Sequence, residues 1–140
     1  MYISPIQEVL MVIIGINDID KVRAFMVKNG ANEKEMTDAY HLALWVEGAP
    51  AGVKHEFLYE FNEDDYPALR VCDTCGCFMN DGYLLGDMAE HYCSRKCAVK
   101  SYIKDAKNYE NKEISYEEAE KRLDHDLEYN NDYCFWTTWY

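Results

Sequence analysis

Hydrophobic residues recur at helical spacing near the start of the chain, next to residues that favour helix starts. Ser4-Pro5 opens the first predicted helix, and Gln7 stands where it completes a capping box with Ser4. The following run "VLMVII" is continuously apolar. Its periodicity does not distinguish a helix from a buried strand, so both remain open for that run.

Two more helices are predicted before residue 50. One begins at Asn17 or Asp18 and ends at Gly30, and the next spans Asn32 to Glu47 and ends at Gly48. The inward-facing residues are expected to be Ile19, Val22, Phe25 and Met26 in the former, and Met36, Tyr40, Ala43 and Leu44 in the latter.

The stretch "VKHEFLYEF" alternates instead. Val53, Phe57 and Phe61 fall on one side of that alternation and charged residues occupy much of the other, which predicts a strand. The acidic turn "NEDDYP" follows it. A boundary between two parts of the chain is therefore expected near Asp64 to Leu69.

The second half of the chain is predicted to form a hairpin and two helices. Turn residues around Gly82 and Gly86 flank short apolar segments, which favours a β-hairpin. A helix is expected over "AVKSYIKDAKNY", and a last helix over 116–128, where Ser115 and Glu118 can form a capping box. The apolar stripe of that last helix is Tyr116, Ala119, Leu123 and Leu127. An aromatic, mostly uncharged tail ends the chain.

Five of the six cysteines fall within 26 residues, in "VCDTCGCFMNDGYLLGDMAEHYCSRKC". Cys72 and Cys75 have zinc-knuckle spacing, and Gly76 supplies the permissive backbone that such a tight turn needs. Cys93 and Cys97 are spaced to place two sulfurs on one helical face. Two such pairs around a hairpin predict a structural Zn²⁺ site with four thiolate ligands, Cys72, Cys75, Cys93 and Cys97.

Two other residues, Cys77 and His91, are alternative ligands for this site. Cys77 could replace Cys75 as a ligand, but its spacing from Cys72 fits a knuckle less well. Cys77 and Cys134 are both interpreted as small buried apolar side chains. His91 is an alternative ligand, although an exposed strand position is the more common role for such a histidine.

Together these elements predict an α+β fold. A helix-rich N-terminal part with one or more strands (1–68) precedes a treble-clef zinc module (69–108). An acidic helix with the aromatic tail (109–140) completes the chain. The length fits one domain or one domain with a small appended module.

Charge is distributed unevenly along a chain whose net charge is −12. From Tyr109 onward there are nine acidic and three basic residues, and residues 56–65 contain five acids and no base. The segment 95–107 is the reverse, with five bases and one acid. As a whole such a chain repels phosphates, so we expect it to favour basic protein surfaces over nucleic acid.

Several functional classes find no support in the sequence. There is no Gly-rich phosphate loop, no nucleophile elbow, no H-E-x-x-H and no deaminase motif, so we do not expect an enzyme. No apolar run is long enough to span a membrane, and the N-terminus lacks the features of a signal peptide. We therefore expect the protein in a reducing cytoplasm. In that compartment clustered cysteines favour a bound metal over disulfides.

Residues 71–140, with "CDTCG", "YCSRKC" and the ending "FWTTWY", resemble small treble-clef zinc proteins of the MYM/TRASH type found in phages and prophages of Gram-positive bacteria. The resemblance implies a zinc-binding phage accessory protein acting in the cytoplasm of a bacterial host cell.

The function that follows is that of a non-enzymatic, acidic interaction protein. It would be a phage-type or anti-CRISPR-like inhibitor that occupies the basic surface of a nucleic-acid-handling defence enzyme. Two alternatives stay open: a nucleic-acid-binding regulator using the treble clef and basic helix 95–107, and a phage structural scaffold. The predicted partner-binding residues are Glu60, Glu63, Asp64, Asp65, Glu117, Glu120, Asp124, Glu128, Trp136 and Trp139. The tail aromatics have a second interpretation, in which they complete the core of the zinc module.

Overall fold

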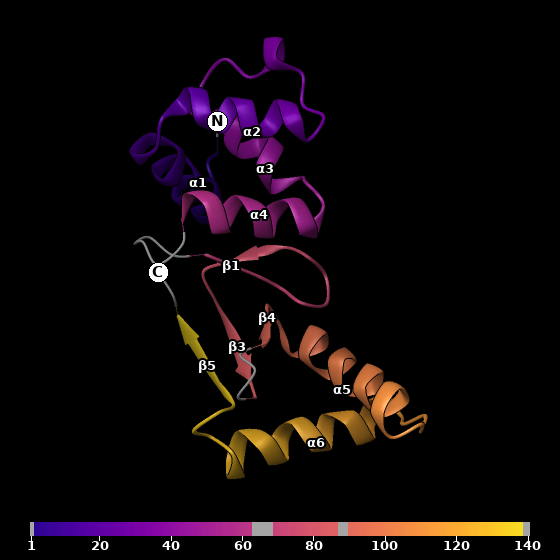
Figure 1. The fold of residues 1–140 in the computed structure, drawn as a ribbon. Helices are drawn as coiled ribbons and strands as arrows, with labels where there is room; N and C mark the ends of the chain where they lie inside the picture. Colours follow the sequence, from indigo (N-terminus) through magenta and orange to yellow (C-terminus); the bar gives the residue numbers. More distant parts are fainter. Residues whose placement is uncertain (1, 63–68, 87–89, 139–140) are drawn as a thin grey trace. The chain divides into compact units, whose positions relative to one another are not determined.

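The computed structural model describes residues 2–62, 69–86 and 90–138. Within these ranges the chain forms six α-helices, one short 3-10 helix and five strands in two small sheets (Figure 1). The predicted mixture of helices and strands is therefore confirmed. The described residues divide into two units, one drawn from 1–70 and 77–80 and the other from 71–76 and 81–138. None of the described helices has both the length and the apolar character needed to cross a bilayer.

Helix α1 (Pro5–Ile16) begins at the predicted capping box. The Ser4 backbone N–H donates to Gln7 Oε1 at 3.0 Å, and the Gln7 backbone N–H donates to Ser4 Oγ at 3.1 Å. These reciprocal bonds satisfy donors that a helix start otherwise leaves without partners. The run 9–14 is therefore helical, and the strand alternative for it is wrong. Its buried residues are Val9, Leu10, Ile13 and Ile14.

Helix α2 (Ile19–Lys28) also follows the prediction. The Asp18 carboxylate accepts the Asp20 backbone N–H at 3.0 Å and caps the helix. Gly30 has a φ of +97°, a conformation that glycine adopts without steric cost, just after the helix ends. The predicted face is largely inward, with Val22, Phe25 and Met26 buried and Ile19 half-buried.

The helix predicted over 32–47 is wrong in its first half. The chain forms a 3-10 helix, η1 (Glu33–Glu35), and then starts again as α3 (Ala39–Glu47). The break arises because the Asp38 carboxylate accepts the His41 backbone N–H at 2.9 Å and caps a new helix. This start sets a different inward face, so Leu44 is exposed, contrary to the prediction. Met36 and Ala43 are buried as predicted, and Leu42 and Val46 are buried in addition.

The strand predicted over 53–61 is also wrong, since this segment is helix α4 (Ala51–Phe61). Its buried residues are Lys54, Phe57 and Phe61, which recur at helical spacing. The Phe57 ring lies 6.1 Å from the Phe25 ring and 5.3 Å from the Phe61 ring, centroid to centroid. Phe57 and Phe61 fit both patterns, because they lie on the same side of the alternation and are also four residues apart. The alternation therefore concealed the helical spacing. Most of the predicted acidic turn lies outside the described residues.

The strands form two sheets. One pairs β1 (Arg70–Val71) with β2 (Phe78–Met79). The other has the order β4-β3-β5, built from β3 (Asp81–Leu85), β4 (Glu90–Tyr92) and β5 (Phe135–Thr138). The antiparallel β3–β4 pair confirms the predicted hairpin, whereas β5 in the tail is a strand that the sequence pattern does not predict.

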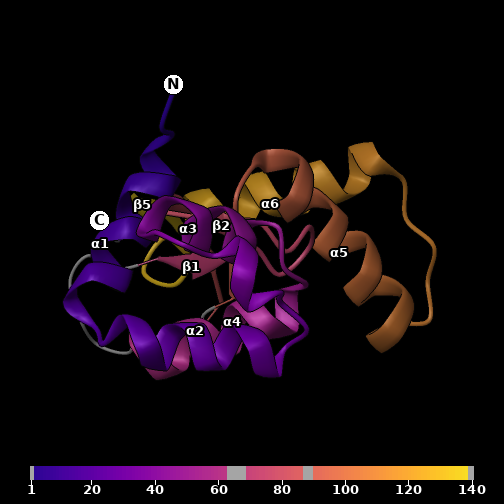
Figure 2. The ribbon, with the colours of Figure 1, turned by 90° about the horizontal axis from the view of Figure 1, so that it is seen from above.

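The two remaining helices lie against each other (Figures 1 and 2). Helix α5 (Arg95–Tyr109) includes the predicted segment 98–109 and Cys97, and α6 (Tyr116–Tyr129) is capped by Ser115, whose Oγ accepts the Glu118 backbone N–H at 3.1 Å. Of the predicted stripe on α6, Ala119 and Leu123 are buried. Leu127 is half-buried and Tyr116 is exposed, so the stripe is narrower than predicted.

Candidate metal centre

The first cysteine pair sits in a tight turn. The Gly76 backbone N–H donates to the Cys72 carbonyl at 3.0 Å and closes the turn behind Cys75. Gly76 has a φ of +78°, where any side chain would be strained. The turn brings the sulfur of Cys75 back toward that of Cys72, as the knuckle prediction requires.

The second pair stands where strand β4 passes into helix α5. Ser94 caps the helix by accepting the Cys97 backbone N–H at 3.2 Å. Cys97 therefore lies in the first turn of α5, whereas Cys93 precedes the helix. The prediction that both sulfurs share a helical face is wrong in this detail. The cap nevertheless turns the chain so that the two sulfurs lie 3.7 Å apart.

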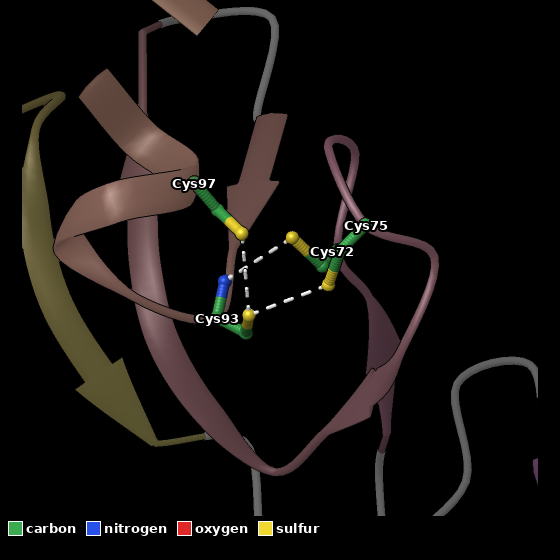
Figure 3. A group of neighbouring side chains, drawn as sticks. All are labelled: Cys72, Cys75, Cys93 and Cys97. Carbon is green, nitrogen blue, oxygen red and sulfur yellow. Dashed lines mark hydrogen bonds between the residues drawn. The ribbon is translucent and has the colours of Figure 1, made fainter. Parts of the chain in front are cut away.

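All four sulfurs converge on one point, and each lies within 4.8 Å of the others (Figure 3). Cys93 Sγ is 3.6 Å from Cys75 Sγ and 3.7 Å from Cys97 Sγ. A tetrahedron of thiolates around an ion with metal–sulfur bonds of about 2.3 Å has edges of about 3.8 Å. A disulfide would require about 2.05 Å. The spacing thus fits four ligands of one metal ion.

Hydrogen bonds fix the knuckle to the elements beside it. The Asp73 backbone N–H donates to the His91 carbonyl at 2.8 Å, and the His91 backbone N–H donates to Asp73 Oδ2 at 2.7 Å. Thr74 Oγ1 donates to the Cys97 carbonyl at 2.8 Å. The Cys93 backbone N–H points at Cys72 Sγ from 3.4 Å. Such contacts hold ligands in place and stabilise negative sulfur.

The electrostatics of the cluster without a cation favour thiols. Burial raises the pKa of Cys93, and its contacts with the sulfurs of Cys75 and Cys72 raise it further. Burial also raises the pKa of Cys97, although Ser94 and Cys93 act in the opposite direction. Closely spaced thiolates repel one another, so a bound cation is what allows them to ionise together. Metal binding at this cluster must therefore release protons.

The other cysteines and His91 lie outside the four-sulfur cluster. Cys134 is buried, as predicted. Cys77 is exposed, so its prediction as a buried side chain is wrong. It precedes β2, where Phe78 and Met79 take the buried positions. His91 is half-buried in β4.

The described partner-binding residues among those predicted belong to three elements, α4, α6 and β5. Glu60 is exposed on α4 and Trp136 is 49% exposed on β5, while Glu63, Asp64, Asp65 and Trp139 lie outside the described residues. The remaining four share a face of α6, because they fall within an arc of about 80° at 100° per residue. They are Glu117, Glu120, Asp124 and Glu128, and we call this face the α6 acidic stripe.

Arg95 lies over the middle of the α6 acidic stripe. Its guanidinium is 2.9 Å from Glu120 Oε2 and 2.9 Å from Asp124 Oδ1. The hydrogen bond to Glu120, followed by that to Asp124, raises the pKa of Arg95 further above its ordinary value. Arg95, the first residue of the basic segment 95–107, therefore pairs with carboxylates of the last helix. Its choice of partners depends on the packing of α5 against α6, which the sequence alone does not encode.

Comparisons with known proteins identify no relative. The sequence matches no protein-family model, and no curated protein and no solved structure shows significant similarity to it.

Proposed function

We propose that this protein is a zinc-stabilised, non-enzymatic interaction protein. The observation that carries this proposal is the convergence of four cysteine sulfurs within 4.8 Å of one another. Four thiolates in a tetrahedron are a characteristic ligand set of structural zinc. A catalytic zinc site keeps one position for water or substrate, and a complete set of four protein ligands leaves none.

The order of elements around the cysteines supports a treble-clef module. A knuckle carries Cys72 and Cys75, the β3–β4 hairpin follows, and the start of α5 carries Cys97 with Cys93 just before it. This is also the arrangement implied by the resemblance to phage treble-clef proteins. A zinc ion here would join two segments that are separate in sequence, 72–75 and 93–97, which gives a small module a rigid centre.

The partner we propose is a basic protein surface, and the proposed contact is the α6 acidic stripe. Glu117 and Glu128 are exposed at its ends, and among the described residues neither has an ion pair. The stripe keeps a net negative charge because four carboxylates face the single guanidinium of Arg95. Carboxylates on a rigid helix can occupy an arginine- and lysine-lined channel built for phosphates. A nucleic-acid-handling defence enzyme is the target class that the phage resemblance adds.

A charge reversal at the ends of the stripe tests this contact. The double variant Glu117→Lys/Glu128→Lys should slow association with the basic partner protein about tenfold or more, because rim charges act mainly on encounter rates. The measurement is surface plasmon resonance against the partner recovered from bacterial lysate, with nucleic acid as competitor.

The matched control is Glu113→Lys with Glu35→Lys, which changes the net charge equally at exposed positions outside α6. It should leave association within a factor of about two to three of the original. If the two double variants slow association equally, net charge and not the α6 acidic stripe is responsible. If neither variant slows association, the proposed function is wrong. Metal content and thermal unfolding should be unchanged in both.

A second candidate, binding of nucleic acid, is favoured by a specific surface of α5. Four lysines lie within an arc of about 80° along about 17 Å of the helix. All four are exposed and have no ion pair within the described chain, whereas Arg95 is occupied by α6. They are Lys96, Lys100, Lys104 and Lys107, and we call them the α5 lysine stripe.

The salt dependence of DNA binding decides on this second candidate. If the α5 lysine stripe holds four phosphates, the logarithm of the binding constant should fall against that of salt concentration with a slope of about −3.6. Changing the four lysines to glutamine should remove that slope. Fluorescence anisotropy with a labelled 20-base-pair duplex measures it. An unmeasurable affinity at about 50 mM salt would leave the basic-protein partner as the remaining candidate.

A further inference from the structure

Strand β5 leaves one edge of the three-stranded sheet open. It pairs with β3 on one side only, so it stands at an edge of the described sheet (Figure 1). Edge strands present backbone N–H and C=O groups to any further strand, and proteins usually protect them with charges, prolines or bulges. The segment 133–138 reads "YCFWTT" and contains none of the charged or proline residues that would block pairing.

A row of aromatic side chains crosses the sheet and becomes more exposed toward this edge. Tyr92, Tyr83 and Trp136 are opposite one another on successive strands, which places them on one face. Tyr92 is 3% exposed, Tyr83 is half-buried and Trp136 is 49% exposed. The Trp136 ring meets the Tyr83 ring edge to face with centroids 4.9 Å apart. One more strand beside β5 would continue this row and cover Trp136.

The charges beside the edge determine what kind of strand fits. Asp81 is opposite Thr138 and both are exposed. Asp132 is exposed just before the strand begins. A residue added opposite Thr138 would lie two strand spacings, about 10 Å, from Asp81. A long Lys or Arg side chain bridges that span, and an Arg opposite Trp136 would also stack on its ring.

We propose that β5 binds an extended, positively charged segment of the partner, which adds a fourth strand to the sheet. This inference rests on the proposed function, because it names how the basic partner is held. A second copy of this chain is the less favourable occupant, since it would bring the same carboxylates to the same edge. Main-chain hydrogen bonds would supply affinity, and Trp136 with the flanking carboxylates would supply selectivity.

The experiment uses the zinc-loaded full chain and two synthetic peptides of equal charge. The probe is acetyl-(Arg-Thr)4-Arg-amide, and the control is acetyl-(Arg-Pro)4-Arg-amide, in which proline removes every second N–H group and favours a polyproline II conformation over a strand. The Arg-Thr peptide should bind about tenfold tighter or more, because it adopts the strand conformation and makes more backbone bonds. It should also slow amide hydrogen exchange in residues 135–138, which the Arg-Pro peptide should not do.

Variants at the exposed edge test the predicted sign of charge. Thr138→Lys should weaken binding of the Arg-Thr peptide about threefold to fivefold, whereas Thr138→Glu should not weaken its binding. Equal binding of both peptides, lost in the Glu117→Lys/Glu128→Lys variant, would overturn strand addition and leave the proposed function intact. Protection of β4 instead of β5, or no binding of either peptide, would also overturn it. If sedimentation shows a dimer that both Thr138 variants dissociate, the occupant is a second copy and the proposal is wrong.

Discussion

Replacing Cys93 with alanine is expected to abolish metal binding and to unfold most of the cysteine-containing segment. The Cys93 sulfur lies close to two other ligands, 3.6 Å from Cys75 Sγ and 3.7 Å from Cys97 Sγ. Its backbone N–H also points at the sulfur of Cys72. Structural zinc sites contribute about 10–16 kcal/mol of apparent binding energy at neutral pH, which is comparable to the whole stability of a domain.

The comparison that isolates the metal is with the cysteines outside the cluster. Cys77→Ser and Cys134→Ser should each retain one zinc ion per chain, because neither residue belongs to the four-sulfur group. Cys134→Ser is expected to cost some stability, since the Cys134 side chain is buried. Metal content by inductively coupled plasma mass spectrometry and folding by circular dichroism measure the two effects separately. Full zinc in Cys93→Ala would defeat the ligand assignment.

Replacing Phe57 with alanine is expected to lower the free energy of unfolding of the unit that contains α1 to α4 by about 3–5 kcal/mol. Phe57 is completely buried and its ring contacts Phe25 and Phe61, so truncation leaves a cavity among three aromatic rings. The effect should be seen as a lower urea midpoint for the helical signal. Zinc content should not change, because Phe57 and the four cysteines belong to different units.

Two further substitutions make this a test of the helix as well as of the core. Phe57→Leu should cost less than about 1.5 kcal/mol, because it keeps most of the buried volume. Glu56→Pro should be severely destabilising, because it removes a backbone N–H from the interior of α4. A neutral Glu56→Pro would contradict the helical assignment of 51–61. A neutral Phe57→Ala would contradict the placement of Phe57 in the core.

The helix starts could be predicted because their information is local. Ser4 with Gln7, and Asp18, each bond to backbone groups within three residues, so their sequence signature is nearly the structure itself. The failures arise where two local signals compete. At residues 32–47 the helical spacing of Met36, Tyr40 and Ala43 spans Asp38 and concealed the new helix start there. At residues 53–61 alternation and helical spacing coincide, and burial of Phe57 by distant rings decides between them.

The candidate metal site was predicted more completely than its surroundings. Spacing alone identified Cys72, Cys75, Cys93 and Cys97, because a metal restricts ligand spacing strongly. Pairing between distant segments has no such signature. The sequence of the tail does not predict that it pairs as a strand with β3. The sequence around Arg95 likewise does not predict which carboxylates it pairs with. Both depend on tertiary contacts that the local sequence does not specify.

The central claim, a structural zinc ion held by four cysteines, is tested most directly by X-ray absorption at the zinc edge of the purified protein. We expect one zinc ion per chain with four sulfur neighbours at about 2.3 Å and no nitrogen or oxygen in its first shell. A shell containing nitrogen or oxygen, or a purified protein that is folded over residues 71–138 without metal, would contradict the account.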